Sequence, residues 1–376
     1  MAVASTAAPG GAEAVDAAAA SDGRKGGKPM YTLAQFRAAG DLGAGSFGTV
    51  RKVVHEDTGE VFAMKVLEKE RVVQRDLQEQ LKREVLTQLR VKHNNVVRLH
   101  YYFEDAARIY CLLEYADGGQ LFAYLRRQKG GVPEPRAAQL FRDTANGLAY
   151  LHSLRIVHRD LKPENILLFG RALNAKIGDF GWCVELTPEA PMRRTFCGTL
   201  DYLAPEMLTS APHDTTVDLW ALGVLLFEML IAKAPFAATS QKETMDRICA
   251  VRFDVPKGSM SPGPEALVRG LLLMEGSKRT PLSKVLQHPW LAAPAAAPLQ
   301  RSADDSILDV TRAAPGRCAA ATSAAAADAD SLDATRIAPR RAGGGGAGQE
   351  PARGHGAAEP SVLLDRTVTV QRRQAG

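Results

Sequence analysis

Runs of apolar residues mark the first third of the chain as strand-rich. FRAAGDLGAG (36–45) and SFGTVRKVVHE (46–56) flank a glycine loop, and VFAMKVLEK (61–69) follows as a third strand-like run. VVRLHYYFED and RIYCLLEYAD are rich in the β-branched and aromatic residues that favour strands. The pattern therefore predicts a small sheet in this part of the chain.

Helical spacing dominates the remainder of the patterned chain. Between the third and fourth strand-like runs, four apolar residues form one stripe: Leu77, Leu81, Val85 and Leu89. Further along, AAQLFRDTANGLAYLHS and VDLWALGVLLFEMLIA predict helices, and the second is apolar on nearly all sides, which is typical of a buried helix. We expect an α+β fold, with a β-rich lobe at about 31–116 and a larger α-helical lobe at about 117–291.

Both ends of the chain have a different composition. Residues 1–30 are rich in alanine, glycine, proline and serine, and residues 292–376 are rich in alanine, glycine and arginine but contain no lysine. Such segments bury too little apolar surface to offset the entropy of ordering, so we predict two disordered tails. Because the N-terminal segment has no basic n-region and carries Glu13 and Asp16, we do not interpret it as a targeting peptide.

The C-terminal tail contains a weak repeat. LDVTRAAPGR (308–317) and LDATRIAPRR (332–341) align without a gap, and LLDRTVTVQRR (363–373) is a candidate degraded third copy. Two interpretations stay open, namely coincidence in a low-complexity segment and a docking or phosphorylation motif that is used more than once.

Bulk composition narrows the classes of function. The 376 residues are 45% hydrophobic and carry a formal charge of +5, which is mild for this length, so we expect no direct nucleic-acid ligand. No apolar run is long enough for a membrane helix, and we expect no membrane association. The five cysteines have no metal-ligand spacing and fit a reducing compartment: Cys111, Cys183, Cys197, Cys249 and Cys318.

The glycine loop LGAGSFGTV is the first candidate for chemistry. Gly43, Gly45 and Gly48 form a GxGxxG pattern, which is weak on its own and suits a dinucleotide site when a helix follows. Here a strand-like run follows, so the loop joins two strands. Its backbone amides can then approach phosphate groups, and Phe47 can close over them.

Two charged residues extend this phosphate site. Lys65 stands in the strand-like AMKVL, and Glu84 stands 19 residues later on the predicted apolar-striped helix. An ion pair between them would hold the ammonium group against the α- and β-phosphates of a nucleotide. The alternative is an unrelated surface lysine and glutamate.

HRDLKPENILL (158–168) is the most specific segment. Asp160 can accept the proton of a substrate hydroxyl, Lys162 can neutralise the transferring phosphate, and Asn165 can hold a metal ion. Asp179, in DFG, can bridge a metal ion to the β- and γ-phosphates. Phosphoryl transfer needs positioning and charge neutralisation, and these groups supply both.

These motifs, in this order, resemble the eukaryotic protein kinases over about residues 36–291. The resemblance implies a bilobal kinase fold with ATP and Mg²⁺ as cofactors. Lys162 and Thr199 resemble the serine/threonine group, and Glu206 of LAPE is expected to pair with Arg279 as in that family. The implied adenine site has Leu113 at its back, backbone hydrogen bonds from Glu114 and Ala116, and three residues over the ring faces: Leu42, Val50 and Ala63.

A narrower resemblance comes from DFGW and RRTFCGTLDYLAPEM, which are similar to the Aurora kinases, as are YCLLEYADGG and HDTTVDLWALGVLLFEML. Gln88 is also similar to that family, in which a glutamine enters the apolar stack running through Leu99, His158 and Phe180. A polar group there should weaken the active arrangement unless water or a partner satisfies it. The resemblance therefore implies an activating partner on the small lobe, either a spindle-microtubule activator or an inner-centromere scaffold.

The charged residues around the predicted site suggest how the enzyme is regulated and which substrates it prefers. A phosphate on Thr195 would carry roughly −1.5 to −2 charge, and Arg159 is placed by its motif to meet it. Arg193 and Arg194 precede Thr195 as in a basic substrate motif, so autophosphorylation is plausible. Glu164 should favour an arginine two residues before the target hydroxyl, which predicts R-x-S/T substrates.

The Aurora resemblance implies a mitotic enzyme, monomeric as a catalytic chain, that phosphorylates histone, spindle and kinetochore proteins. It implies a nuclear and cytoplasmic protein that reaches the spindle, the poles, or the centromere and midzone during division. Ala204, where the family usually has proline, and Cys183, where it usually has serine, indicate a divergent lineage, of protist or algal type. The alternatives are a basophilic serine/threonine kinase of a neighbouring group and a pseudokinase scaffold, and the second would require a broken catalytic residue.

Overall fold

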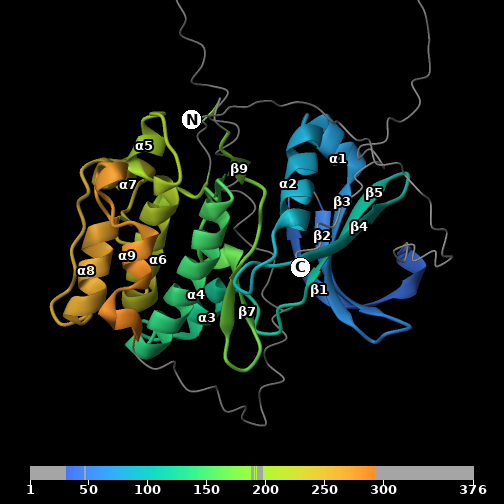
Figure 1. Ribbon diagram of the computed structural model, residues 1–376, viewed down its shortest axis with the longest axis horizontal. Helices are drawn as coiled ribbons and strands as arrows, with labels where there is room; N and C mark the ends of the chain where they lie inside the picture. Colours follow the sequence, from blue (N-terminus) through green and yellow to red (C-terminus); the bar gives the residue numbers. More distant parts are fainter. Residues whose placement is uncertain (1–30, 46–47, 188–189, 191, 193–197, 293–376) are drawn as a thin grey trace, which may run out of the picture.

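The computed structural model describes residues 31–292, with gaps at residues 46–47, 188–189, 191 and 193–197. Two lobes lie side by side, one built on a sheet and the other mainly from helices (Figure 1). The predicted bilobal α+β architecture is therefore confirmed. Both tails, including the repeats, lie outside the described residues.

The small lobe is a five-stranded antiparallel sheet in the order β1-β2-β3-β5-β4. Its strands are those that the apolar runs predict: β1 Phe36–Gly45, β2 Gly48–His55, β3 Val61–Glu68, β4 Leu99–Glu104 and β5 Arg108–Glu114. Because side chains alternate across a strand, Phe62 and Met64 of β3 point into one apolar cluster and Leu67 into another.

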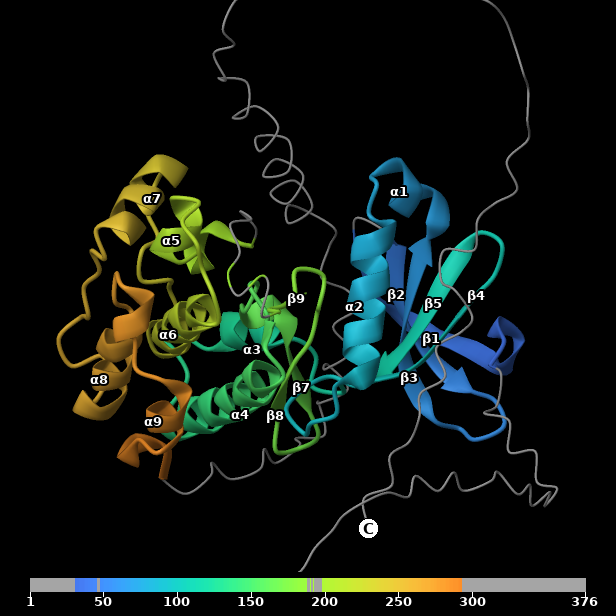
Figure 2. The same cartoon turned by 45° about the horizontal axis from the view of Figure 1, so that its top comes forward.

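Two helices follow β3 in the small lobe. The short α1 (Lys69–Gln74) was not predicted, whereas α2 (Gln78–Arg90) is the predicted striped helix. Leu81 and Val85 of its stripe are buried against the sheet, and Leu77 and Leu89 pack partly buried beside them. The helix lies on the side of the sheet that faces the large lobe (Figure 2), so its polar face is available to residues there.

The large lobe packs around one buried helix, α6 (Thr216–Ile231), as the all-round apolar pattern predicts. The other helices of this lobe are α3 Leu121–Arg127, α4 Glu134–Ser153, α5 Pro205–Leu208, α7 Gln241–Cys249, α8 Pro262–Leu271 and α9 Leu282–Leu286, and α6 packs mainly on α4 and α8. The indole of Trp220 stacks on Phe236 with ring centroids 5.2 Å apart. A Cβ at Gly223 would lie 2.8 Å from the Leu271 side chain, so close packing of α6 on α8 requires glycine there.

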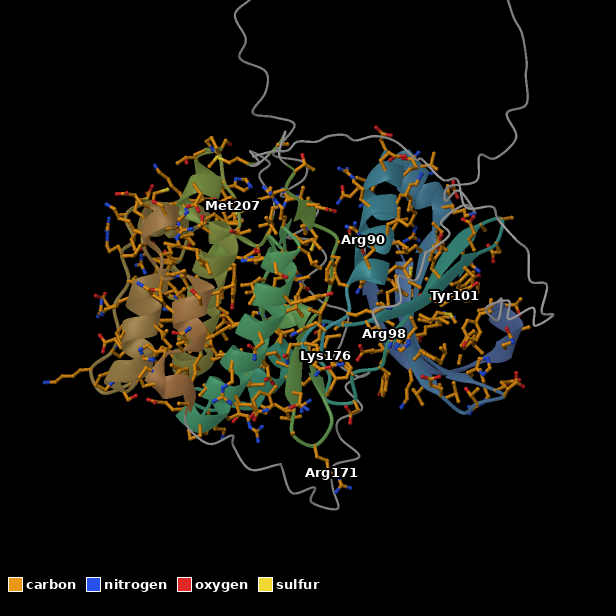
Figure 3. The ribbon with its side chains drawn as sticks, viewed as in Figure 1. Arg90, Arg98, Tyr101, Arg171, Lys176 and Met207 are labelled. Atoms are coloured by element: carbon orange, nitrogen blue, oxygen red, sulfur yellow. The ribbon has the colours of Figure 1, made fainter. Side chains whose placement is uncertain are left out.

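Two short strand pairs, which the apolar pattern did not predict, bring the motif-bearing loops together where the lobes meet. β6 (Ile156–Val157) pairs with β9 (Val184–Glu185), and β7 (Ile166–Phe169) pairs with β8 (Asn174–Ile177). Lys176 on β8, labelled in Figure 3, forms an ion pair with Glu114 at the end of β5, which ties the large lobe to the chain that connects the lobes. Within residues 31–292, outside the gaps, no helix is long and apolar enough to span a bilayer.

Candidate active site

Lys65 and Glu84 form the ion pair that their spacing predicts. The Lys65 Nζ atom lies 2.7 Å from Glu84 Oε1, which joins the middle of β3 to the middle of α2. Burial alone would lower the pKa of Lys65, but the negative charges of Glu84 and Asp179 outweigh it and raise the pKa. The lysine therefore stays charged, as a group that binds phosphate must.

The glycine loop connects β1 to β2 as a hairpin, as the strand-like runs on both sides predict. Gly48 has a structural requirement of its own, because a Cβ there would lie 1.7 Å from the carbonyl oxygen of Val66 on β3. A Cβ at Gly43 would meet no atom within 4 Å. Phe47 lies outside the described residues, so its predicted position over the phosphates stays a prediction.

The residues expected around adenine come together on β1, β2, β3 and the end of β5. Ladder pairing sets Gly43 opposite Val50 and Ala63 opposite Leu113. After β5, the carbonyl of Ala116 accepts a hydrogen bond from Gly119 N at 3.2 Å, and its own N–H has no acceptor among the described residues. A free backbone donor at this point suits the edge of a purine base.

The segment between β6 and β7 gathers the predicted catalytic groups. The Asn165 side chain donates to the Asp160 backbone oxygen at 2.8 Å and to Asp160 Oδ2 at 2.9 Å, which fixes the carboxylate. Lys162 Nζ lies 2.9 Å from Asp160 Oδ2 and donates to Thr199 Oγ1 at 2.7 Å. Asp160, Lys162 and Thr199 therefore surround one point where a hydroxyl group can meet a phosphate.

Asp179 follows β8 with a left-handed backbone, at φ 54°. Burial raises the pKa of its carboxyl group, but the Lys65 ammonium and the Gly181 N–H lower it by more, so the net pKa is lowered and the group is ionised. Asn165 and Asp179 are oxygen donors of the kind that Mg²⁺ binds through one or two side chains plus substrate phosphates. This fits a site without a full protein cage, and the described residues contain no cluster of three or more His, Cys, Asp or Glu side chains that could hold a metal ion.

Asp218, in the first turn of α6, orients the catalytic segment and was missed in the sequence. Its fully buried carboxylate accepts hydrogen bonds from His158 N at 2.9 Å and Arg159 N at 2.8 Å. His152 Nε2 lies 2.8 Å from the same carboxylate. The available signal was an acid in a run that is apolar except for Asp218 and Glu228, because a buried charge needs partners.

The comparisons with known proteins agree with this geometry. The protein kinase domain model matches residues 36–291. The chain is 41% identical to Aurora kinase C of Mus musculus over 261 residues, 69% of this chain and 93% of the relative. It is 41% identical to Aurora-1 of Arabidopsis thaliana over 280 residues, 74% of this chain and 92% of the relative.

This chain is a protein kinase of the Aurora family. It is also 42% identical to Aurora kinase A-A of Xenopus laevis over 267 residues, which cover 71% of this chain and 64% of that relative. The chain is therefore a serine/threonine protein kinase, with ATP, a divalent metal ion and protein substrates implied by the family.

Two members of the stack that contains Gln88 are in contact in this kinase. His158 and Phe180 meet edge to face with ring centroids 5.9 Å apart, and Leu99 is buried. Gln88 is 7% exposed, and its Nε2 donates to the Val97 carbonyl over a long 3.4 Å. The amide is thus held by one weak bond, which supports the expectation that this position limits the stability of the active arrangement.

Two bonds that the sequence did not indicate connect α2 with the segment after DFG. Gln80 Nε2 donates to the Gly181 carbonyl at 2.6 Å. Arg90, labelled at the end of α2 in Figure 3, contacts Glu185 on β9 at 2.5 Å. They hold the helix that carries Glu84 against the segment that carries Asp179.

Arg159 lies beside the catalytic aspartate with a left-handed backbone, at φ 67°. Its Nε donates to the carbonyl of Trp182 at 2.8 Å, so the residue after DFG anchors the arginine through its backbone while its indole is 42% exposed. The buried Nη1 atom has no hydrogen-bond acceptor among the described residues. Thr195 lies outside those residues, and its pairing with Arg159 stays a prediction.

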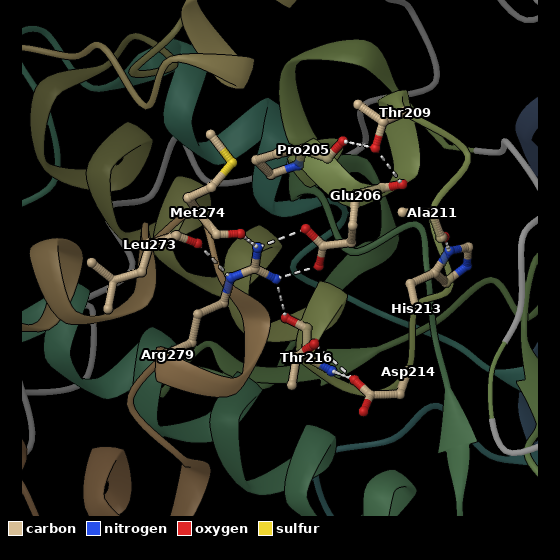
Figure 4. Close-up of polar contacts among 10 residues, drawn as sticks. All are labelled: Pro205, Glu206, Thr209, Ala211, His213, Asp214, Thr216, Leu273, Met274 and Arg279. Atoms are coloured by element: carbon tan, nitrogen blue, oxygen red, sulfur yellow. Dashed lines mark hydrogen bonds and ion pairs between the residues drawn. The ribbon is translucent and has the colours of Figure 1, made fainter.

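The predicted pair of Glu206 and Arg279 is confirmed (Figure 4). Two guanidinium nitrogens of Arg279 donate to the two carboxylate oxygens of Glu206, at 2.6 and 2.7 Å. The same side chain donates to the backbone carbonyls of Thr216, Leu273 and Met274 and lies over the Trp220 ring. This pair fixes the end of the activation segment on the core.

Three carboxylates lie close enough to interact electrostatically, on Glu164, Asp201 and Glu228. Burial raises the pKa of Glu164, a backbone hydrogen bond and the Lys162 charge lower it by less, and the charges of Asp160 and Asp201 raise it further. Burial likewise raises the pKa of Glu228, and the charges of Glu164 and Asp201 raise it further. The Tyr202 hydroxyl, which donates to Glu228 Oε2 at 2.5 Å, lowers this pKa by less than burial raises it. A cation placed among them would relieve this repulsion. The sequence analysis had identified Glu164 alone.

Proposed function

We propose that this Aurora kinase transfers the γ-phosphate of ATP, with Mg²⁺, to serine or threonine in R-x-S/T motifs. Lys65, held by Glu84, binds the α- and β-phosphates, while Asn165 and Asp179 hold the metal ion that neutralises phosphate charge. Asp160 orients the substrate hydroxyl and accepts its proton as the new oxygen–phosphorus bond forms and ADP leaves. The proposal also takes residues 31–291 as the catalytic domain, flanked by tails at 1–30 and 292–376.

Lys162 and Thr199 act on the transferred group and on the substrate. Lys162 stabilises the negative charge on the γ-phosphoryl group, and its bond to Thr199 keeps both beside Asp160. Thr199 positions the substrate hydroxyl, because its own hydroxyl lies 3.4 Å from Asp160 Oδ1. Asp218 and Asn165 keep the Asp160 carboxylate in a single orientation.

The carboxylate cluster carries the substrate preference. An arginine two residues before the target hydroxyl would place its guanidinium among Glu164, Asp201 and Glu228. None of these three forms an ion pair among the described residues, and Lys162, whose charge lowers the pKa of Glu164, is itself paired with Asp160 at 2.9 Å. Charge-assisted hydrogen bonds of this kind contribute about 1.5–3 kcal/mol each. The preference for arginine over glutamine at this position should therefore be about tenfold or more in kcat/KM.

The test compares two peptides that differ only by arginine or glutamine at this position, with the native kinase and with Glu164→Gln. We expect the native kinase to favour the arginine peptide and Glu164→Gln to lose most of that preference through KM. Glu56→Gln, which removes an exposed acid on the small lobe, is the matched control and should keep the preference. Equal use of both peptides by the native kinase would contradict the proposal.

Phosphorylation of Thr195 is the proposed activating switch. The buried Nη1 of Arg159 lacks an acceptor among the described residues, and a phosphate would supply one with up to two negative charges. Thr195→Val should lower kcat at least tenfold, while Thr187→Val, which changes another threonine of the same segment, should have little effect. Full activity of Thr195→Val would refute this role.

The cellular role that we propose is mitotic. The chain would phosphorylate histone, spindle and kinetochore proteins as a monomeric catalytic chain, activated by a spindle-microtubule activator or an inner-centromere scaffold on the small lobe. The weak hydrogen bond of Gln88 supports a need for such a partner. A tagged copy should reach the spindle and poles, or the centromeres and midzone, from the nucleus and cytoplasm. Exclusion from all of them throughout division would contradict the role.

A further inference from the structure

The arginines of residues 293–376 are followed, two positions later, by an unusual set of residues. Several of them have alanine two positions later, where R-x-S/T requires a hydroxyl: Arg301, Arg312, Arg317, Arg336, Arg340 and Arg373. Not one arginine in this segment is followed at that distance by serine or threonine. The segment therefore repeats the basic half of the proposed substrate motif without a residue that can accept phosphate.

In the two aligned repeats, the residue two positions before each threonine is acidic rather than basic. Thr311 and Thr335 are each preceded, two residues earlier, by an aspartate, Asp309 and Asp333. A carboxylate at this place in the substrate would face Glu164 and its neighbours, and like charges repel when partly buried. The threonines of the repeats are therefore poor substrates for this kinase, although the same chain carries them.

We propose that the repeats at 308–317 and 332–341, the latter with Ala342, bind the kinase's own substrate site as pseudosubstrates. Arg312, Arg336 or Arg340 would take the place of the substrate arginine at Glu164, Asp201 and Glu228. The residue in the position of the target hydroxyl would be Ala314, Ala338 or Ala342. This inference rests on the proposed R-x-S/T preference of the same site.

Charge and register together select this occupant. Among the described residues, none of the three carboxylates forms an ion pair, and the neighbouring Lys162 ammonium is paired with Asp160 at 2.9 Å, so the group favours a guanidinium. Alanine keeps the small size of serine but has no oxygen to attack the γ-phosphate. The bound repeat would thus block protein substrates and leave the ATP site open, because Lys65 and Asp179 lie outside the surface that it covers.

The length of the chain permits this binding. Arg312 stands about 20 residues after Ala292, and a chain of that length can span at most about 70 Å. Arg336 follows about 44 residues after Ala292, which gives a limit of roughly 150 Å. A compact domain of about 260 residues has a diameter of roughly 50 Å, and a path half-way round it is about 80 Å. The second repeat can therefore reach any part of the surface, and the first can reach all but the most distant part. Tethering gives each repeat an effective concentration of up to about millimolar.

The experiment uses the full chain and measures steady-state phosphorylation of an R-x-S peptide. The variant Arg312→Gln/Arg336→Gln/Arg340→Gln removes the arginine of each proposed pseudosubstrate. The control Arg353→Gln/Arg366→Gln/Arg372→Gln removes the same charge from arginines that have histidine, valine or glutamine two residues later. We expect the first variant to lower the KM of the peptide about three- to tenfold with unchanged kcat, and the control to behave as the native chain.

A second measurement converts one pseudosubstrate into a substrate. In Ala342→Ser the new hydroxyl stands two residues after Arg340, whereas in Gly344→Ser it stands two residues after alanine. We expect phosphate at position 342 of the first variant, at a rate per molecule that does not depend on enzyme concentration. Phosphorylation at position 344 should be at least tenfold slower. These variants lie outside the catalytic domain, so its folding does not enter the comparison.

The outcomes separate this inference from the function on which it rests. If the native kinase prefers the arginine peptide but the first arginine variant keeps the native KM, the repeats do not bind the substrate site and the inference is refuted alone. Equal phosphorylation of positions 342 and 344 would refute it as well. If the native kinase shows no preference for the arginine peptide, the proposed substrate specificity fails, and the pseudosubstrate interpretation fails with it.

Discussion

Replacing Arg279 by methionine should destabilise the large lobe more than any exposed ion-pair substitution. The Arg279 side chain is fully buried, and it donates to both oxygens of Glu206 and to three backbone carbonyls (Figure 4). Arg279→Met keeps the apolar part of the side chain but removes every one of these donors. The Glu206 carboxylate, 15% exposed, then remains in the lobe without its cation.

The magnitude follows from the partners that are left behind. Breaking a buried ion pair by removal of one member costs about 3–5 kcal/mol. Each of the three carbonyls that is left without a donor costs about 1–3 kcal/mol. Part of this cost is already included in the cost of breaking the ion pair. We therefore expect a loss of about 4 kcal/mol in the free energy of unfolding. For a domain of this size, this corresponds to a fall in Tm of roughly 8–16 °C.

Thermal unfolding followed by tryptophan fluorescence measures this directly, because Trp220 lies 5.1 Å from the guanidinium group. The matched control is Arg269→Met, which breaks an exposed i,i+4 pair with Glu265 and should cost less than about 1 kcal/mol. If Arg279→Met lowers Tm by no more than Arg269→Met does, the pair with Glu206 does not stabilise the lobe and this reasoning is refuted.

Three further predictions test other parts of the site. Gln80→Ala removes the 2.6 Å bond from α2 to Gly181 and should lower kcat several-fold while Tm changes little; an unchanged kcat would show that the bond does not position α2. Gln88→Leu replaces an amide held by a 3.4 Å bond with an apolar side chain, and should raise partner-independent activity about two- to fivefold, as measured without any added protein. The preference for the arginine peptide should weaken as pH falls. The pKa values of Glu164 and Glu228 are raised, so these carboxylates take up protons at a higher pH than ordinary carboxylates do. A preference that stays constant down to the pH at which ordinary carboxylates take up protons would contradict this.

Local pattern was sufficient to predict the elements whose burial is regular. β3, β5, α2 and α6 each have a clear apolar pattern, and all of them form. The short pairs β6–β9 and β7–β8 were not predicted, since two to four residues give no measurable period. The six-residue α1 was missed for the same reason.

Motifs predicted the charged residues of the site but not the groups that orient them. The pairs Lys65–Glu84 and Glu206–Arg279 were expected from motif positions, and both form. Asp218 was missed because its partners are backbone N–H groups far away in the sequence, which no side-chain motif records.

Substrate preference was predicted from Glu164 alone, whereas the arginine site that we propose also includes Asp201 and Glu228. Asp201 and Glu228 come from different segments, and only the fold brings them beside Glu164. A spacing rule cannot show an electrostatic site that is assembled from three separate elements. The expected regulation through Thr195 depends in the same way on a position that the sequence suggests and the described residues do not include.

The central claim is that this chain is an active kinase for basic serine/threonine motifs. The most direct measurement is ATP-dependent phosphate transfer to an R-x-S peptide by the native chain and by Asp179→Asn, with circular dichroism showing that both are folded. We predict steady transfer by the native chain and a loss of at least a hundredfold in Asp179→Asn, because the metal-binding carboxylate is gone. Equal signals from the two proteins would contradict the account.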